Sequence, residues 1–342
     1  MKIGVYTDPH ITRKINYLPD RTQNIVDTFR DMYGIFKLHD VSKVVCCGDF
    51  FDKARILSSD MKLVSYVMEV LADSGLETII LSGNHDFGDS KDSIADILNT
   101  LPNVRTVSRF EHEILQGIDL IYIPYGSTLE EESVHGRNIV FSHEEYAGMI
   151  INTLGTKSRS TKTVNKYDGR LVVNGHIHRF SQDTGFLNLG TCIPTKFGEL
   201  DFRSLPCVAI IDTDNLKYIL EPLTEPYRFY ILSDITSAVD LQSKVSEIHS
   251  DEQWKCCIRI DHTCDTKELS NVDLSGFKYV SYRKVIPESS SLETKNVSIT
   301  GSAQKVNVVP FIETRVNGDT ELSDTSKSLI LKEVMNTLRG EV

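Results

Sequence analysis

The first half of the chain alternates short apolar runs with longer stretches in which apolar residues recur at helical spacing. Residues Arg21–Leu38 and Ser59–Ala72 have this helical periodicity, and Gly75 follows the second stretch as a typical helix stop. The runs that predict strands are Ile3–Tyr6, Val44–Cys47, Thr78–Leu81, Ile139–Phe141 and Leu171–Val173. Such an alternation is typical of an α/β domain.

Further along, the predicted strands lie closer together. Between Asn103 and Phe141 several strand-like runs follow one another with little room for crossover helices. Val208–Asp212 and Tyr218–Leu220 then predict a β-hairpin. We therefore expect an α/β fold of two packed β-sheets flanked by helices, in a domain that spans residues 1–222.

The pattern changes after this domain. Residues 223–286 contain strands and one helix in an order that predicts a small α/β capping domain. Its expected elements are the strands Phe229–Ile235, Lys255–Asp261 and Tyr279–Val285 and the helix Asp240–His249. Residues 287–322 are polar and predict a linker. Residues 323–342 predict a short amphipathic C-terminal helix, whose apolar face carries Leu331, Val334, Met335 and Leu338.

Length and composition favour a globular protein of the cytoplasm. The 342 residues exceed one ordinary hydrophobic core, and no apolar run reaches the ~18 residues of a membrane span, so we expect no membrane partner. The first strand begins near the N-terminus without the features of a signal peptide. The seven cysteines show no CxxC spacing and are expected to be reduced.

Polar residues able to bind metal ions follow the five strands of the first paragraph. They lie in five motifs: Asp8-Pro9-His10, Gly48-Asp49, Gly83-Asn84-His85-Asp86, Ser142-His143 and Gly175-His176-Ile177-His178. Each motif alone is ordinary, because such residues often cap helices or form turns. In an open α/β sheet, however, binding groups converge at the carboxyl ends of the strands. The ordered set therefore predicts one shared site.

The ligand chemistry of this set favours a pair of metal ions. Imidazoles, carboxylates and one amide oxygen, with no thiolate, suit manganese, iron or zinc. Two ions about 3.5–4 Å apart can hold a phosphate and supply hydroxide near neutral pH. Such a pair needs a bridging carboxylate, and Asp49 is the natural bridge because it stands between two sets of terminal ligands.

The five motifs resemble those of calcineurin-like metallophosphoesterases and, within them, the SbcD-type double-strand-break repair nucleases. The resemblance implies two divalent ions, with Mn²⁺ as the expected metal and Mg²⁺, Fe²⁺ or Zn²⁺ as alternatives. It assigns one ion to Asp8, His10, Asp49 and His178, and the other to Asp49, Asn84, His143 and His176. It also places His85 near the leaving group.

Asp52 is a second candidate catalytic residue, three positions after Asp49. Some phosphatases of the superfamily have a similarly placed aspartate that pairs with the histidine corresponding to His85. We therefore hypothesise that Asp52 orients His85 and favours its protonated form, since a nearby carboxylate stabilises imidazolium. The alternative is that Asp52 only caps a turn.

By the same resemblance, the chain is expected to be a metal-dependent DNA exonuclease or endonuclease that hydrolyses phosphodiester bonds at DNA ends in recombination and repair. The family implies a homodimer within a heterotetramer, with an SMC-like coiled-coil ATPase of the SbcC type as partner, and the compact length resembles phage-encoded members. The C-terminal helix would dock on the ATPase, or else fold back on its own domain. Two alternatives remain: a phosphodiesterase or phosphomonoesterase for small phosphate esters, and a mainly architectural DNA-end-binding subunit.

The overall charge does not favour DNA binding. The chain has 37 Lys and Arg against 48 Asp and Glu, a net charge of −11, whereas affinity for DNA normally depends on basic residues. Two local segments are exceptions and supply the candidate DNA-binding residues. One contains Arg13 and Lys14, with Arg21 nearby, and the other is the loop that carries Lys157, Arg159 and Lys162. The alternative for such a loop is a solvated segment without a ligand.

Overall fold

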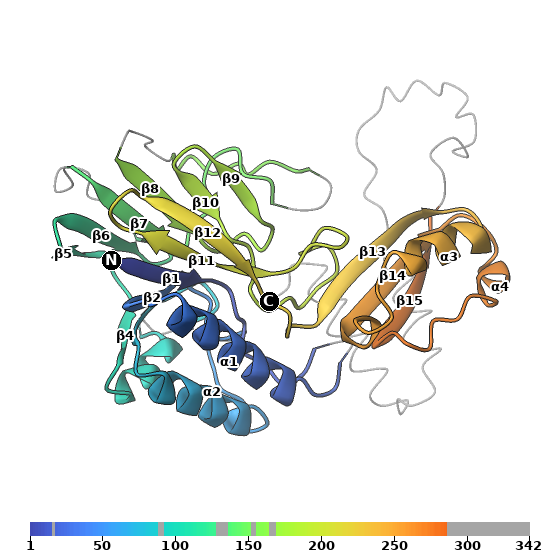
Figure 1. Ribbon diagram of the computed structural model, residues 1–342, viewed down its shortest axis with the longest axis horizontal. Coiled ribbons are helices and arrows are strands. Elements are labelled where there is room, and N and C mark those ends of the chain that lie inside the picture. The colour runs from blue at the N-terminus through green and yellow to red at the C-terminus, as the bar shows by residue number, and fades with distance from the viewer. Residues whose placement is uncertain (16–17, 88–91, 128–135, 152–154, 164–168, 286–342) are drawn as a thin grey trace, which may run out of the picture. The chain divides into compact units, whose positions relative to one another are not determined.

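The structure is a computed structural model that describes residues 1–15, 18–87, 92–127, 136–151, 155–163 and 169–285. The predicted linker at 287–322 and the predicted C-terminal helix at 323–342 lie outside the described residues. Within the described ranges, the strands form two large sheets and one smaller sheet, and Figure 1 shows them with most strands labelled.

The first sheet contains the strands that precede the first three motifs. Its described strands are β1 (Lys2–Tyr6), β2 (Lys43–Cys46), β3 (Glu77–Leu81), β4 (Val104–Val107), β11 (Cys207–Asp212) and β12 (Lys217–Pro222). They are arranged in the order β12-β11-β1-β2-β3-β4. β1 to β4 are parallel, so their carboxyl ends meet at one edge. β11 runs antiparallel to β1 and pairs with β12 as the predicted hairpin.

The second sheet contains the strands that precede the last two motifs. Its described strands are β5 (Glu111–Leu115), β6 (Ile118–Ile123), β7 (Asn138–Ser142), β8 (Arg170–Asn174), β9 (Ser181–Asp183) and β10 (Phe186–Asn188). They follow the order β5-β6-β7-β8-β10-β9, with β6, β7 and β8 parallel. The expectation of two packed sheets flanked by helices is therefore confirmed, and both sheets are mixed.

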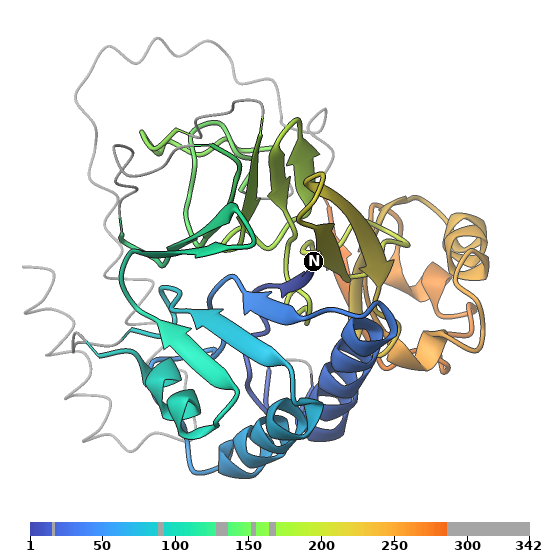
Figure 2. The ribbon, with the colours of Figure 1, turned by 60° about the vertical axis from the view of Figure 1, so that its left-hand side comes forward.

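Two apolar layers hold this sandwich together. β1 is covered on both faces. Successive side chains point to opposite sides, so that Val5 faces the second sheet while Tyr6 faces the helices. The helices α1 (Thr22–Leu38) and α2 (Met61–Ser74) cover the outer face of the first sheet, as Figure 2 shows. The Tyr6 ring lies 6.0 Å from that of Phe29 in α1. The 3₁₀ helix η1 (Ile94–Thr100) joins the same layer.

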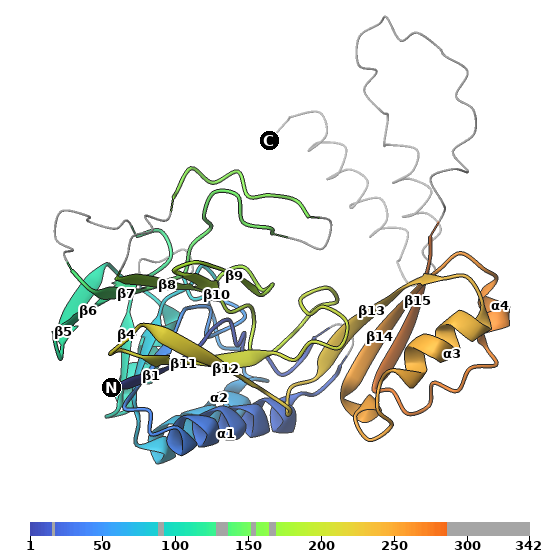
Figure 3. The ribbon, with the colours of Figure 1, turned by 45° about the horizontal axis from the view of Figure 1, so that its top comes forward.

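The third sheet is formed by the part of the chain that follows β12. It contains β13 (Arg228–Ile235), β14 (Cys256–His262) and β15 (Tyr279–Lys284), all parallel, with α3 (Ala238–Ser246) and α4 (Thr266–Leu269) packed on one face (Figure 3). α3 begins two residues before the expected Asp240 because the Ser237 hydroxyl accepts a hydrogen bond from the Asp240 amide at 3.2 Å. The division into domains at residue 222 stays a prediction.

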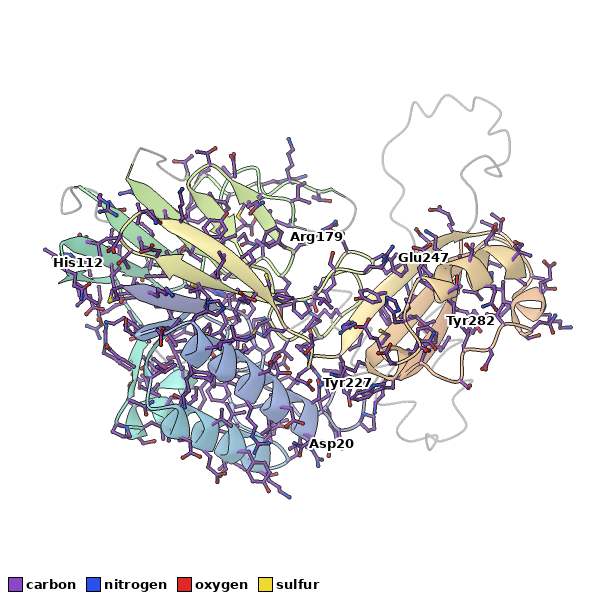
Figure 4. The ribbon with its side chains drawn as sticks, viewed as in Figure 1. Asp20, His112, Arg179, Tyr227, Glu247 and Tyr282 are labelled. Carbon is purple, nitrogen blue, oxygen red and sulfur yellow. The ribbon has the colours of Figure 1, made fainter. Side chains whose placement is uncertain are left out.

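The start of α1 contacts the segment that leads into the third sheet. The Asn24 amide donates to the Glu225 carbonyl at 2.6 Å and accepts from the Tyr227 main chain at 3.3 Å. Figure 4 shows Tyr227 close to this end of α1. Arg21 is 1% exposed here, donates to the Pro194 carbonyl at 3.0 Å, and has its pKa lowered to about 10 by burial. Its grouping with the exposed basic residues is therefore wrong, since packing covers it.

The structure also bears on the expectations about membranes and cysteines. Across the described ranges, no helix combines the length and the apolar character that a membrane span requires. All seven cysteines are free thiols, as expected from their spacing.

Candidate metal centre

The ligand-bearing loops leave the carboxyl ends of β1, β2 and β3 in the first sheet and of β7 and β8 in the second. Four of the candidate ligands have left-handed backbone conformations that non-glycine residues rarely adopt: Asp8 (φ 51°), His10 (φ 41°), Asp49 (φ 49°) and His176 (φ 73°). Backbone strain of this kind costs about 1–3 kcal/mol per residue and is retained mainly at functional sites. Among the described residues, four of the nine non-glycine positions with positive φ therefore lie at this one edge of the sandwich.

Asp49 lies at the centre of the ligand set. Its Oδ2 atom is 3.5 Å from His10 Nε2 and 3.4 Å from His143 Nε2, so one oxygen faces both halves of the set. Its Oδ1 atom accepts a hydrogen bond from the His85 main chain at 2.8 Å. This close approach requires Gly83, because a Cβ there would lie 2.1 Å from Asp49 Oδ1. The geometry fits the bridging position expected for Asp49.

The first half of the set consists of Asp8, His10, Asp49 and His178, whose ligand atoms all lie within 4.8 Å of one another. His10 Nε2 and His178 Nε2 face each other at 3.0 Å. Asp8 is completely buried, and the His176 main chain donates to both of its carboxylate oxygens at 3.2 and 3.1 Å. The main chain thus orients Asp8 toward the two imidazoles.

The second half consists of Asp49, Asn84, His143 and His176. The nitrogen and carboxylate atoms of Asp49, His143 and His176 lie within 4.8 Å of one another. The Asn84 side-chain oxygen is 2.8 Å from His176 Nδ1 and 3.2 Å from His143 Nε2. Every residue that the resemblance assigned to a metal is therefore brought to this site.

Buried acceptors hold two of the imidazoles by the nitrogen that faces away from the ligand set. His143 Nδ1 lies 2.6 Å from the Cys47 carbonyl, and His178 Nδ1 lies 2.6 Å from Glu199 Oε1. With the proton on Nδ1, each Nε2 presents a lone pair to the site, as in carboxylate–histidine–metal arrangements. Glu199 is itself held by the amides of Thr195 and Lys196 at 2.6 and 2.8 Å.

Two buried asparagines fix the backbone on both sides of two histidine ligands. Asn174 Oδ1 accepts from the Ser142 hydroxyl at 2.7 Å and from the Glu144 amide at 3.1 Å, which are the neighbours of His143. Asn188 donates to the carbonyls of Ile177 and Arg179 at 2.7 Å each, and these are the neighbours of His178. Asn174 also donates to Asn188 at 3.0 Å. The asparagine pair therefore sets the distance between the two ligand loops.

Asp86 connects the loops of Asp49 and Asn84. Its buried carboxylate accepts hydrogen bonds from the amides of Phe50, Phe51 and Gly83 at 3.2, 2.9 and 2.8 Å. Burial and the neighbouring Asp49 raise the pKa of Asp86 to about 7. Asp86 thus acts on the ligands through their backbone.

The two candidate catalytic residues are in contact, but through the main chain of one of them. His85 Nδ1 lies 2.7 Å from the main-chain carbonyl of Asp52. An oxygen of the Asp52 carboxylate lies 3.9 Å from His10 Nδ1, and ligand atoms of His10, Asp52 and His85 all lie within 4.8 Å of one another. The His85 ring is 4.7 Å from the His10 ring, which places His85 beside the first half of the ligand set. Asp52 therefore orients His85 through its main-chain carbonyl oxygen, which remains when the side chain of Asp52 is substituted.

The electrostatics of the set fit bound cations. Asp8 and Asp49 are 0% and 1% exposed, and burying a carboxylate is costly unless a positive charge compensates it. Their ion-pair partners among the described residues are imidazoles. Burial lowers the pKa of His10 well below its ordinary value and that of His176 to about 4, so both rings are neutral and able to bind a metal. Burial also lowers the pKa of His143 and of His178, but Asp49 outweighs it at His143 and raises that pKa to about 9, and Glu199 outweighs it at His178, whose pKa is raised. A bound cation would replace the Nε2 proton of each ring. The residues therefore fit two divalent ions.

The candidate DNA-binding residues differ in how free their charges are. Lys157, Arg159 and Lys14 are exposed. Lys162 pairs with the buried carboxylate of Glu144 at 2.5 Å, and Arg13 lies 3.5 Å from Asp20. Paired charges contribute less to phosphate binding because their field is partly compensated, so Lys157 and Arg159 are the stronger candidates of the loop.

The sequence interpretation missed the positioning residues of this site, namely Glu199, Asn174, Asn188 and the role of Asp86. Asp86 stands inside a motif, and its place next to a ligand was a usable signal. Glu199 and Asn188 lie 21 and 10 residues from His178 and contact its surroundings only through the fold. The Phe197-Gly198-Glu199 segment shares a weak family-type similarity, but no local pattern indicates that Glu199 or Asn188 would contact the surroundings of His178.

Comparison with known proteins agrees with this geometry. The family model of the calcineurin-like phosphoesterases matches residues 1–180, which is more than half of the chain. A sequence relative is the DNA double-strand break repair protein Mre11 of Saccharolobus solfataricus, which is 22% identical over 194 residues. That match covers 52% of this chain and 50% of the relative, so the chain spans about half the length of this relative.

Solved structures give weaker likenesses. An archaeal phosphodiesterase has 18% identity and a TM-score of 0.36, and covers 65% of this chain and 100% of its own. The phosphoesterase Yfce from E. coli has 14% identity and a TM-score of 0.33 with the same coverage, 65% and 100%.

We expect Asp49→Asn to lower the metal content. The substitution keeps the shape of the side chain but removes the charge that both halves of the ligand set share. After loading with Mn²⁺, elemental analysis should find close to two ions per parent chain and clearly fewer in the variant. Asp60→Asn is the matched control, because this buried aspartate accepts a bond from the Arg13 main chain outside the ligand set. Equal metal content in Asp49→Asn and the parent would show that Asp49 is not the bridge.

We expect Asn188→Ala to weaken Mn²⁺ binding about 10- to 100-fold, as substitutions behind metal ligands typically do. Asn24→Ala is the matched control, since Asn24 is also a buried asparagine with two main-chain partners but lies at the start of α1. Both changes should lower the free energy of unfolding of the metal-free protein by about 1–3 kcal/mol. Calorimetric titration with Mn²⁺ should separate them, and the same affinity in both variants would contradict the role of the asparagine pair.

Proposed function

Because the chain belongs to the calcineurin-like phosphoesterase family, we propose that it is a metal-dependent nuclease that hydrolyses phosphodiester bonds at DNA ends. The observation that carries the proposal is the ligand set around Asp49, in which one oxygen faces His10 on one side and His143 on the other. The likeness to the double-strand break repair protein Mre11 supports DNA as the substrate. The proposal includes Mn²⁺ as the metal.

Two divalent ions held by this set would polarise a phosphate and supply the nucleophile near neutral pH. The chain's own residues hold the geometry. Asp49 keeps the two ligand groups together, Glu199 fixes the ring of His178, and Asn174 and Asn188 fix the loops around them. His85 stands beside the first group and is oriented by the Asp52 carbonyl, so that it can donate a proton to a departing oxygen.

Hydrolysis of small phosphate esters is the second candidate. The charges favour it, because the chain is acidic overall and two of the candidate DNA-binding residues, Arg13 and Lys162, already have carboxylate neighbours. A small ester needs only the ligand set and His85. The two candidates therefore differ in whether residues beyond the ligand set contribute to binding.

We also propose that the chain acts with an SMC-like coiled-coil ATPase as a homodimer within a heterotetramer. The apolar face predicted for residues 323–342 supports this proposal. A partner that supplies basic surface would reconcile a DNA substrate with the net charge of −11.

We expect His85→Ala to retain its metals and lose most of its turnover, because general acid catalysis contributes about 10²–10⁴-fold. Asp52→Ala should lose clearly less, since the main-chain carbonyl that contacts His85 remains. Both variants are tested by measuring the rate of plasmid DNA cleavage and the rate of turnover of a chromogenic diester. Their metal content is measured alongside. Equal losses in the two variants would show that the Asp52 carboxylate is needed, and normal turnover in His85→Ala would remove His85 from the reaction.

DNA and small esters should respond differently to changes in the basic loop. We expect the double substitution Lys157→Ala, Arg159→Ala to weaken DNA binding and to flatten its dependence on salt, because phosphate contacts release counterions. Turnover of a small diester should fall much less. Lys217→Ala with Lys267→Ala is the matched control, since these two lysines lie in β12 and α4. An unchanged salt dependence in the loop variant would exclude the loop from the DNA path.

A further inference from the structure

An aromatic side chain stands at the solvent side of the second half of the ligand set. The Tyr125 ring is 5.7 Å from the ring of His176 and 6.3 Å from that of His143. Tyr125 is nevertheless 42% exposed, so a large part of the ring faces solvent beside the ligands. Tyr125 is not one of the candidate metal ligands, positioning residues or catalytic residues described above.

The backbone around Tyr125 is anchored to the ligand loops on both sides. Its amide donates to the Ser82 carbonyl at 3.0 Å, and Ser82 directly precedes the Gly83-Asn84 motif. The next residue, Gly126, donates to the Glu144 carboxylate at 3.1 Å, and Glu144 directly follows His143. Gly126 has φ 77°, a conformation that favours glycine. The backbone of Tyr125 is thus held in a fixed place relative to the loops that carry Asn84 and His143.

We propose that Tyr125 is a stacking platform for a nucleobase of the substrate. An exposed, immobilised aromatic ring binds bases of any identity, because every base offers a flat π-face. This inference rests on the proposed function, since it adds a base subsite to the same reaction. A stacked base would add affinity that does not depend on basic residues, in a chain whose net charge is −11.

The position of Tyr125 indicates which nucleotide it binds. His85 lies beside His10 in the first half of the ligand set, whereas Tyr125 lies beside His176 in the second half. In an in-line displacement the attacking and leaving oxygens are on opposite sides of the phosphorus. The nucleoside that keeps the phosphate is attached at an equatorial oxygen between them. If His85 donates a proton to the leaving oxygen, Tyr125 lies away from the departing group, on a side that the retained nucleoside can occupy.

Two p-nitrophenyl esters test this directly. In the p-nitrophenyl ester of thymidine 5′-phosphate and in methyl p-nitrophenyl phosphate, water adds to phosphorus, the bond to the nitrophenyl oxygen breaks, and nitrophenol leaves. The leaving group is the same, and only the first ester has a base on the part that keeps the phosphate. We expect the parent to have a higher kcat/KM for the thymidine ester, and Tyr125→Ala to reduce this preference roughly tenfold or more.

Tyr125→Phe and Tyr125→Trp should restore the preference, because both retain a π-face, whereas Tyr125→Leu should not. Mn²⁺ content is measured for every variant. An unchanged ratio in Tyr125→Ala would overturn the proposal, as would an equal fall for both esters accompanied by metal loss, which would make Tyr125 a support for the histidines. A parent that prefers the thymidine ester but does not degrade DNA would support the base subsite and refute the nuclease proposal.

Discussion

The burial of two carboxylates among imidazoles is the interaction on which the rest of the site depends. Asp8 and Asp49 have almost no contact with solvent, and a charge in that position is tolerated only where compensating charges surround it. The fold brings four histidines from two sheets to the edge that holds these carboxylates, and divalent ions held by this set would supply the compensating charge. Four residues of this set, Asp8, His10, Asp49 and His176, also have positive φ, a backbone strain that packed surroundings must stabilise.

The apolar layer between the sheets makes this convergence possible. The loops that follow β1, β2 and β3 carry Asp8, Asp49 and Asn84, while the segments that follow β7 and β8 of the other sheet carry three of the histidines. The two edges are held together by inward-facing residues such as Val5, Val45, Phe141 and Val173. Because a packed core deforms little, the spacing between the two ligand groups is set by side chains far from the metals.

The loop of residues 194–199 connects the site with the third sheet. At one end, Glu199 holds His178. Within the same loop, Pro194 accepts a hydrogen bond from the buried Arg21, and the ring of Phe197 lies 5.7 Å from the Arg259 guanidinium of β14. Displacing the third sheet would therefore act on a metal ligand through its hydrogen-bond partner. The packing of the third sheet and the geometry of the metal centre are therefore coupled through this loop.

The sequence alone predicted the strands that precede the five motifs, the two main helices and the candidate ligand residues, because these follow from local patterns. Parallel strands must end together, so the polar residues that follow such strands can be assigned to one site from their order along the chain. Tertiary packing decided the contacts between distant segments. Glu199 and the asparagine pair reach the histidines only in the folded chain, Arg21 is buried by packing, and Lys162 is paired with Glu144. Asp52 contacts His85 through a carbonyl, which every residue has and which no sequence pattern can indicate.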